Sequence, residues 1–309
     1  MTRATRSRYH IATSPAPLPF APPARFHLAE NDEYVKYGHP PFATPTRGDP
    51  YWTPEIISQT WFMAERGKIP ISGAGYGGPF AGPGFDAIWL DMSEIVRPTR
   101  DGIHGREYIA TGVDLGRKLP FVRQDGGGSA APPLIELPIP VLFNPFPFPT
   151  TTRAPVLAVA GAAATLSTLA VIAPEQWAGD LRPFAGAVGL RLRPEEIEPQ
   201  REIWRQSRYV ELDGGDPGSI AALKRGRPDI IVALRIPLDR IDGAQAAALV
   251  RDGVEVLHLY ADESGRTGGQ FVGDALRDLH RHLVQAGVRD EVTIVASGGI
   301  ATAEHVPKA

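Results

Sequence analysis

After about residue 130 the chain alternates short, continuously apolar segments with stretches of helical periodicity. The apolar segments are Ile139 to Phe143, Thr168 to Ala173, Ala187 to Leu192, Tyr209 to Leu212, Ile230 to Ile236, Val256 to Tyr260 and Val292 to Ala296. Segments that are apolar throughout are typical of strands in a parallel sheet that is buried on both faces. We expect helices between them at Pro155 to Leu166, Pro194 to Ser207, Ser219 to Lys224, Gly243 to Asp252 and Gly269 to Gly287. The alternation predicts an α/β fold in which helices cover a parallel sheet.

The spacing of these units suits either a (β/α)8 barrel or an open, doubly wound sheet. No Gly-x-Gly-x-x-Gly motif opens the first unit, which argues against a dinucleotide-binding sheet. Seven strands are predicted, whereas a closed barrel needs eight. We therefore expect a (β/α)8 TIM barrel whose last β/α unit is missing, in a chain that is truncated at its C-terminus.

The first 130 residues differ from the rest in composition. Residues 1–50 are rich in proline and low in periodicity, which is typical of a partly disordered arm. Residues 51–130 are expected to form a helix at Pro54 to Arg66 and a Gly-rich extension that packs on the barrel. The stretch Asp125 to Ser129 is the best candidate linker, and the barrel itself is expected to span residues 131–309.

Composition excludes several classes of function. A formal net charge of −3 gives no reason to expect a nucleic-acid or anionic-membrane partner. The absence of cysteine excludes disulfides, thiolate metal sites and cysteine nucleophiles, and it fits a cytoplasmic protein. No His, Asp or Glu grouping has the spacing of a metal site. Val156 to Ala173 carries no charge, but its small residues and the flanking Pro155 and Pro174 favour a barrel helix followed by a strand over a membrane span.

The last strand runs into Ser297-Gly298-Gly299. Glycines let the backbone approach a phosphate closely, so that amide protons can point at its oxygens. Phosphate sites in barrels favour the loops after strands seven and eight. We expect this turn to bind phosphate, and the alternative is an ordinary strand-to-helix turn.

Two further features lie at the ends of predicted strands. Asp262 to Gly269 follows the sixth predicted strand and combines mobile glycines with polar groups, so it is either an active-site loop or a solvated turn. Arg235 lies in an otherwise apolar strand, where it either reaches a ligand or pairs with Asp213 or Asp239 at the rim. His258 and Tyr260 are more simply explained as satisfied core residues than as catalytic groups.

Several segments together resemble one protein family. They are Tyr51 to Glu55, Ala64 to Lys68, Phe85 to Leu90, Gly265 to Gly268 and Arg289 to Ile300. In this order they are similar to the FMN-binding barrel domain of glutamate synthase large subunits, and especially to stand-alone glutamate synthase-like FMN-binding proteins. The last segment is the most specific, because Arg289-Asp290 precedes the strand that ends in Ser297-Gly298-Gly299.

The resemblance implies a barrel of the FMN-dependent phosphate-binding type. It implies an FMN-dependent oxidoreductase that acts on CH–NH2 donors and forms glutamate from 2-oxoglutarate and ammonia, or acts on a related amino acid, with an electron-donor protein or domain as partner. The residues implied to bind FMN are Ser297, Gly298, Gly299, Gly265, Thr267 and Gly268. Arg235 and Glu175 are the catalytic residues that it implies.

The chain departs from the family at three places. Phe146 to Thr150 replaces the family's flavin-wrapping loop with a Pro-rich segment, and proline cannot donate an amide hydrogen bond. Ala173 to Gln176 keeps only Glu175 of a second family motif, and the family's strand-five lysine becomes Ala233 or Arg235. Two alternatives stay open: a barrel that binds FMN or another phosphorylated ligand without turnover, and another phosphate-barrel enzyme, such as a nitronate monooxygenase-like flavoprotein or an aldolase.

Overall fold

The computed structural model describes residues 112–118, 132–146, 152–262, 265–300 and 305–309, together with Thr60, Ala64, Phe85 and Ile88. The chain divides into two units, Met1–Gly78 and Pro79–Ala309, and the fold below is that of the second. The expected arm of residues 1–50, most of the extension in residues 51–130 and the linker at Asp125 to Ser129 lie outside the described residues.

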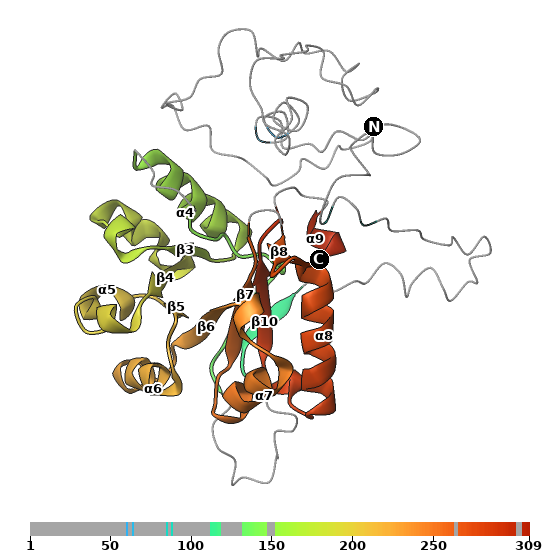
Figure 1. The fold of residues 1–309 in the computed structure, drawn as a ribbon. Coiled ribbons are helices and arrows are strands. Elements are labelled where there is room, and N and C mark those ends of the chain that lie inside the picture. Colours follow the sequence, from blue (N-terminus) through green and yellow to red (C-terminus); the bar gives the residue numbers. More distant parts are fainter. Residues whose placement is uncertain are drawn as a thin grey trace, which may run out of the picture. The chain divides into compact units, whose positions relative to one another are not determined.

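A curled, parallel sheet forms the centre of the fold (Figure 1). Its order is β10-β7-β6-β5-β4-β3, and every neighbouring pair is parallel. The strands are β3 (Ala170–Ile172), β4 (Val188–Leu192), β5 (Tyr209–Asp213), β6 (Ile231–Pro237), β7 (Val256–Tyr260) and β10 (Thr293–Ser297). Within the described part of the chain no strand joins β10 to β3, so the sheet is an open half-barrel. The predicted α/β fold with an incomplete (β/α)8 barrel is confirmed.

One predicted strand is wrong. Ile139 to Phe143 does not form a strand, and only Phe143 pairs with the sheet, through a single parallel bridge to Ala170. The Phe143 amide donates to the Leu169 carbonyl over 2.9 Å, and the Val171 amide donates to the Phe143 carbonyl over 2.9 Å. The segment contains Pro140 and is flanked by Pro138 and Pro145. Because proline lacks an amide proton and fixes φ, the ladder cannot extend in either direction.

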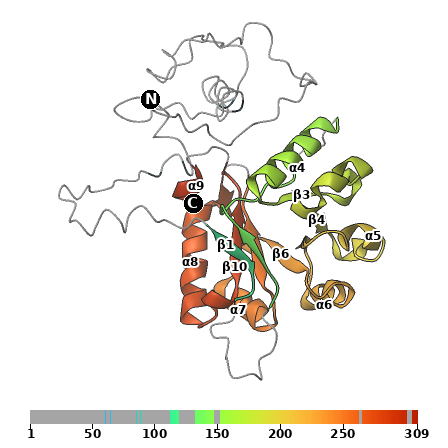
Figure 2. The same ribbon diagram turned by 180° about the vertical axis from the view of Figure 1, so that it is seen from behind.

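Helices cover the outer face of the sheet (Figures 1 and 2). Among the described residues, the longest α-helices are α4 (Ala154–Leu166), α6 (Pro217–Gly226), α7 (Gly243–Arg251) and α8 (Val272–Gln285), all of them in predicted regions, and a 3-10 helix, η4, spans Gly179–Ala187. Asp216 and Asp242 cap α6 and α7, because their carboxylates accept from the Ser219 and Gln245 amides. α7 begins at Gly243, as predicted, whereas α6 begins at Pro217, two residues before the predicted Ser219.

The predicted helix at Pro194 to Ser207 is only partly correct. The region forms a short 3-10 helix, η5 (Pro194–Glu196), then turns, and then a single α-helical turn, α5 (Arg201–Trp204). Pro199 lies between the two, and a proline inside a helix removes a hydrogen bond and clashes with the preceding turn.

The uncharged stretch from Val156 to Ala173 is divided between two elements. α4 ends at Leu166, Ser167 adopts a left-handed conformation with φ 55°, and β3 begins at Ala170. Among the described residues, no helix is both long enough and apolar enough to cross a bilayer.

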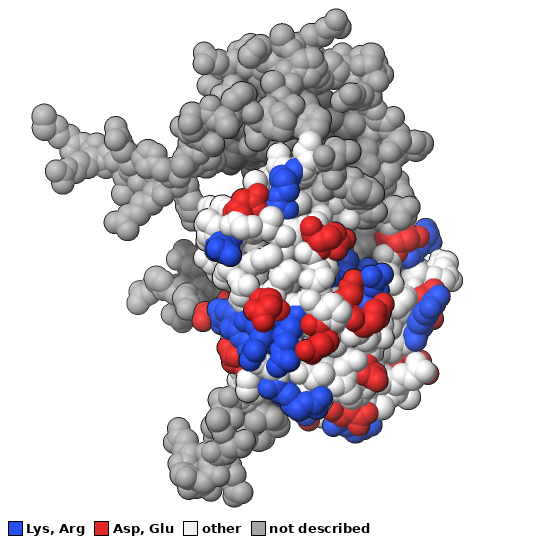
Figure 3. Space-filling model, turned by 90° about the vertical axis from the view of Figure 1, so that its left-hand side faces the viewer, with Lys and Arg blue, Asp and Glu red and all other residues white. Residues whose placement is uncertain are grey.

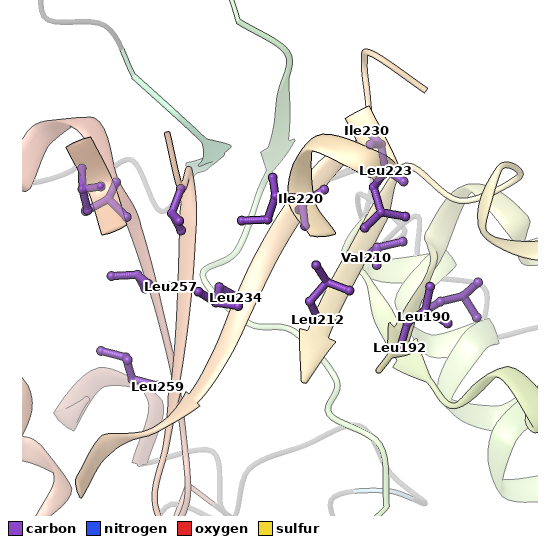
Figure 4. Close-up of a cluster of buried hydrophobic side chains, with 14 of the residues drawn as sticks. Leu190, Leu192, Val210, Leu212, Ile220, Leu223, Ile230, Leu234, Leu257 and Leu259 are labelled. Atoms are coloured by element: carbon purple, nitrogen blue, oxygen red, sulfur yellow. The ribbon is translucent and has the colours of Figure 1, made fainter. Parts of the chain in front are cut away.

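The hydrophobic core lies on both faces of the sheet. On the outer face, Ile220 and Leu223 of α6 lie in one cluster with Val210 and Leu212 of β5, and Leu234 continues this cluster on β6 (Figure 4). On the inner face, apolar side chains of the strands pack against a hairpin of β1 (Val113–Gly116) and β2 (Leu134–Leu137). The residues of this inner cluster are Leu115, Ile135, Leu137, Leu169, Val171, Tyr209, Ile231, Ala233 and Val256.

The hairpin is held at the amino-terminal end of β10. The Thr293 hydroxyl donates to the Gly116 carbonyl over 2.9 Å, and the Gly116 amide donates back to this hydroxyl over 3.3 Å. This hairpin was not predicted from the sequence. It fills the inner face near the amino ends of the strands, which leaves the polar residues at the carboxyl ends as the candidate site.

Candidate functional site

Polar side chains occupy the inner face of the half-barrel toward the carboxyl ends of the strands. Because side chains alternate along a strand, Glu211 lies on the same face as the inner-core Tyr209, and His258 on the same face as Val256. Arg235 pairs in register with Asp213 on one side and with His258 on the other. Tyr260 pairs with Ser297 in the same way. The carboxyl edge of a parallel sheet is where ligands bind in both barrels and open α/β sheets.

Ser297 of β10, His258 of β7 and Glu211 of β5 form a continuous line of hydrogen bonds that passes over β6. The His258 Nε2 atom lies 2.8 Å from the Ser297 hydroxyl oxygen. The His258 Nδ1 atom lies 2.8 Å from the Glu211 Oε1 atom. The side chains of His258 and Glu211 are 2% and 1% exposed, whereas Ser297 is only partly buried. The line therefore leads from the accessible edge into the interior.

Both carboxylate oxygens of Glu211 accept hydrogen bonds from neighbouring side chains. Its Oε2 atom accepts from Arg191 Nε over 3.0 Å and from Arg191 Nη2 over 2.8 Å, while Oε1 also accepts from the Tyr209 hydroxyl over 3.2 Å. Burial alone would raise the pKa of the Glu211 carboxyl, but His258 and Arg191 lower it from its ordinary 4.5 to about 2. Glu211 is therefore an ionised carboxylate whose charge is balanced by a two-point contact with arginine.

The ionised state of Glu211 determines which nitrogen of His258 carries the proton. A carboxylate can only accept hydrogen bonds, so the Nδ1 atom that contacts it must be an N–H donor. In the neutral imidazole, Nε2 then carries the lone pair and accepts the Ser297 hydroxyl proton. This arrangement leaves the oxygen lone pairs of Ser297 free to face away from the ring.

Arg235 is fixed at the same edge by two neighbours, Asp213 on β5 and Tyr260 on β7. Its Nη1 atom donates to Asp213 over 3.1 Å, and its guanidinium carbon lies 3.5 Å from the centroid of the Tyr260 ring. Of the two carboxylates expected at the rim, Asp213 is the partner in the structure. The Nε atom of Arg235 is buried and has no hydrogen-bond partner among the described residues. The arginine therefore retains an unused donor.

The Ser297–Gly298–Gly299 turn requires glycine. Gly298 and Gly299 have φ values of 113° and 71°, which side chains rarely tolerate. A Cβ atom on Gly298 would lie 2.7 Å from the Asp262 carbonyl oxygen and 2.8 Å from that of Ala261. Neither glycine amide donates a hydrogen bond to another residue in the described part of the chain. The turn thus presents two backbone donors beside the Ser297 hydroxyl.

The remaining predicted cofactor residues lie in the loop after β7. Gly265 packs directly on the turn, since its Cβ position is 3.4 Å from the Gly298 carbonyl oxygen. Thr267 belongs to a small hairpin of β8 (Arg266–Thr267) and β9 (Gln270–Phe271), and Gly268 lies at its tip near Asp239. Gly265 is therefore brought to the turn, whereas Thr267 and Gly268 lie further along the loop.

The two predicted catalytic residues are not brought together. Glu175 is exposed on η3 (Pro174–Gln176), just after β3, and β4 and β5 separate β3 from the strand of Arg235.

Within the described residues, no cluster of three or more His, Asp or Glu side chains is placed to hold a metal ion. On the face drawn in Figure 3, basic and acidic side chains are interspersed rather than gathered by sign.

Sequence reasoning missed Glu211 and Arg191. Each interrupts an apolar strand in the same way as Arg235, in the stretches Tyr-Val-Glu-Leu and Leu-Arg-Leu. A charged residue inside a buried strand is costly unless it is paired, so these two residues could have been matched as a pair. The two residues meet because Arg191 of β4 lies directly opposite Glu211 of β5 in the register of the sheet.

Comparisons with known proteins give a likeness of fold only. No family model matches the chain, and no curated protein matches it. Among solved structures, the aldolase QR15 is 9% identical with a TM-score of 0.40, over 54% of this chain and 83% of the aldolase. The deoxyribose phosphate aldolase from Aeropyrum pernix is 14% identical with a TM-score of 0.42, over 55% and 81% of the two chains. Likenesses of this size carry no argument about the chemistry of the site.

The identification with the glutamate synthase family was wrong. No family model supports it, and the similar solved structures are aldolases rather than flavin oxidoreductases. The predicted class, an FMN-dependent oxidoreductase acting on CH–NH2 donors to form glutamate, was therefore also wrong. The physical reason is that a strand followed by Gly-Gly, with a Gly-rich loop beside it, reports a backbone geometry. Barrels of many different functions share this geometry at the carboxyl ends of their strands.

Proposed function

We propose that this chain binds a small phosphorylated molecule at the carboxyl edge of β6, β7 and β10. The observation that carries the proposal is the Ser297–Gly298–Gly299 turn, which combines a hydroxyl with two backbone amides that donate to no other described residue. Successive backbone amides of this kind form concave sites for phosphate oxygens. The predicted roles of Ser297, Gly298 and Gly299 in holding a phosphate are retained in this proposal.

Arg235 supports the proposal with a fixed positive charge. Its guanidinium lies against Tyr260 of β7, the strand between β6 and β10, and Tyr260 is the register partner of Ser297. Stacking and the bond to Asp213 fix its orientation before any ligand arrives. Apart from the bond of Nη1 to Asp213, the Arg235 guanidinium makes no hydrogen bond to another described residue, so it has N–H donors left for a ligand oxygen.

The strands do not favour covalent chemistry through a lysine. A class of aldolases forms a Schiff base between a lysine and a carbonyl substrate, but β3 to β7 and β10 contain no lysine. FMN remains a prediction as one phosphorylated ligand among several, and it belongs in the binding experiment with simpler phosphates.

Isothermal titration calorimetry with inorganic phosphate, ribose 5-phosphate and FMN tests the proposal. We expect at least one phosphorylated probe to bind the full chain and Arg235→Gln to weaken it about tenfold or more, because a hydrogen bond to a charged group contributes about 1.5–3 kcal/mol. Arg193→Gln is the matched control, because Arg193 is exposed just after β4, and its ion-pair partners among the described residues are Glu195 and Glu196. Circular dichroism confirms that each variant is folded.

Two results would overturn the proposal. One is that none of the three probes binds the folded wild-type chain. The other is that a probe binds with the same affinity to wild type, Arg235→Gln and Ser297→Ala, which would place its site elsewhere.

A further inference from the structure

The line of Ser297, His258 and Glu211 has the order of groups that activates a hydroxyl. An imidazole within hydrogen-bond distance can take the hydroxyl proton, and a buried carboxylate on its far nitrogen fixes the tautomer and stabilises the imidazolium that forms. Here both contacts are 2.8 Å, and the acid, base and hydroxyl come from β5, β7 and β10. Such constellations are recognised by geometry and not by their order along the chain.

The donors and acceptors along this line are arranged so that the Ser297 hydroxyl can give its proton to His258. Glu211 accepts from His258 Nδ1, so Nε2 of the neutral ring accepts the Ser297 hydroxyl proton. Arg191 balances the Glu211 charge through two hydrogen bonds of its own. In the neutral ring, Nε2 is therefore placed to take the Ser297 proton.

The groups next to Ser297 suit an electrophile with negatively charged oxygens. The Gly298 and Gly299 amides follow the hydroxyl directly, and Arg235 supplies a cation from the neighbouring part of the sheet. Phosphoryl transfer depends mainly on positioning and on stabilising charge on the phosphoryl oxygens. A phosphate held by this turn would lie beside the activated oxygen.

We propose that Ser297 is a nucleophile that takes the phosphoryl group from a phosphomonoester, with His258 as its general base; this rests on the phosphate site proposed above. In the first step, the bond between Ser297 Oγ and phosphorus forms as the bond from phosphorus to the leaving oxygen breaks. The Ser297 proton passes to His258 Nε2 and then to the leaving alkoxide, which departs as an alcohol. In the second step, His258 Nε2 takes a proton from water, and the bond between the water oxygen and phosphorus forms as the bond between Ser297 Oγ and phosphorus breaks. His258 returns this proton to Ser297 Oγ, and inorganic phosphate leaves.

Glu211 acts in this scheme as a positioning residue. It contacts neither the substrate nor the reacting oxygen, and it works by holding the His258 ring and its tautomer. Loss of its charge would make His258 a weaker base. The rate profile of Glu211→Gln should therefore move to lower pH, which a purely structural role for Glu211 would not produce.

Hydrolysis of p-nitrophenyl phosphate by the full chain tests the proposal, together with intact-mass spectrometry for one added phosphoryl group. We expect Ser297→Ala to abolish both signals and His258→Gln to reduce the rate by a factor of about 10² to 10⁴, the usual contribution of a general base. Arg193→Gln should match wild type. Ribose 5-phosphate titrations of wild type and Ser297→Ala are run in parallel, so that loss of binding is separated from loss of turnover.

The outcomes distinguish this proposal from the phosphate site on which it rests. If wild type binds ribose 5-phosphate but releases no p-nitrophenol, the nucleophile is refuted and the binding site stands. If neither binding nor turnover occurs, both are refuted. Equal rates in wild type and Ser297→Ala would also refute the nucleophile. So would hydrolysis of p-nitrophenyl acetate through Ser297 without hydrolysis of the phosphate, which would indicate acyl transfer.

Discussion

Replacing Glu211 with glutamine tests whether its buried charge organises the inner face of the sheet. The carboxylate accepts hydrogen bonds from His258, Tyr209 and twice from Arg191. A glutamine side chain has a single acceptor oxygen, so its NH2 group must face donors on one side. The change also leaves the charge of Arg191, whose side chain is 17% exposed, without its partner carboxylate.

Two independent routes give the size of the effect. Removing one partner of a buried ion pair typically destabilises a protein by about 3–5 kcal/mol. Lowering the pKa of Glu211 from 4.5 to about 2 corresponds to about 3 kcal/mol at 1.36 kcal/mol per pH unit. We therefore expect Glu211→Gln to lower the free energy of unfolding by about 3 kcal/mol at pH 7.

The sign of the pH dependence follows from the direction of the pKa shift. A carboxyl whose pKa is lower in the folded chain stabilises the fold fully above its unfolded value, near 4.5, and loses this contribution as pH falls toward 2. The part of the stability difference between wild type and Glu211→Gln that comes from ionisation of Glu211 should therefore be complete above about pH 5 and shrink below it.

Urea denaturation followed by circular dichroism measures this difference at pH 7 and at pH 4. Glu196→Gln serves as the control, because Glu196 pairs with Arg193 on the surface, where such pairs contribute about 0–1 kcal/mol. A loss below about 1 kcal/mol for Glu211→Gln, or a difference between wild type and Glu211→Gln that grows as pH falls, would refute the reasoning.

Two further predictions concern stability. Tyr209→Phe removes the buried hydroxyl that donates to Glu211 and should lower the free energy of unfolding by about 1 kcal/mol in the same urea assay; an unchanged value would show that this bond contributes nothing. Gly243→Ala places a Cβ atom 2.3 Å from the His282 Cβ atom where α7 meets α8, so it should destabilise the chain by about 1–3 kcal/mol. The control Gly186→Ala has nothing within 4 Å of its new Cβ atom, and equal melting temperatures for the two variants would contradict the prediction.

Much of the half-barrel could be predicted because its signals are local. Asp242 marks the start of α7, because it forms a capping box with Gln245. The apolar stretch Ile231 to Leu234 forms the buried part of β6. The strand expected at Ile139 to Phe143 failed because hydrophobicity was given more weight than the prolines around it. The β1–β2 hairpin was missed because its four-residue strands, with little periodicity, are stabilised by the inner face of the sheet and not by their own sequence.

The candidate site could be predicted only in part for the same reason. The Ser297–Gly298–Gly299 turn is visible as a local motif, and the pairing of Arg235 with Asp213 was one of two alternatives. The contact between Glu211 and His258 joins residues 47 positions apart, and only the register of the sheet places them together. The family resemblance failed because it depended on short glycine motifs, which report backbone geometry and not chemistry.

Glycine-selective 15N labelling with amide NMR is the most direct test of the phosphate site. During titration with ribose 5-phosphate, we expect the amide protons of Gly298 and Gly299 to shift downfield as they donate to phosphate oxygens, while Gly186 on the outer surface stays unchanged. If ribose 5-phosphate binds and the Gly298 and Gly299 amides do not move, the phosphate does not lie at this turn and the central claim is wrong.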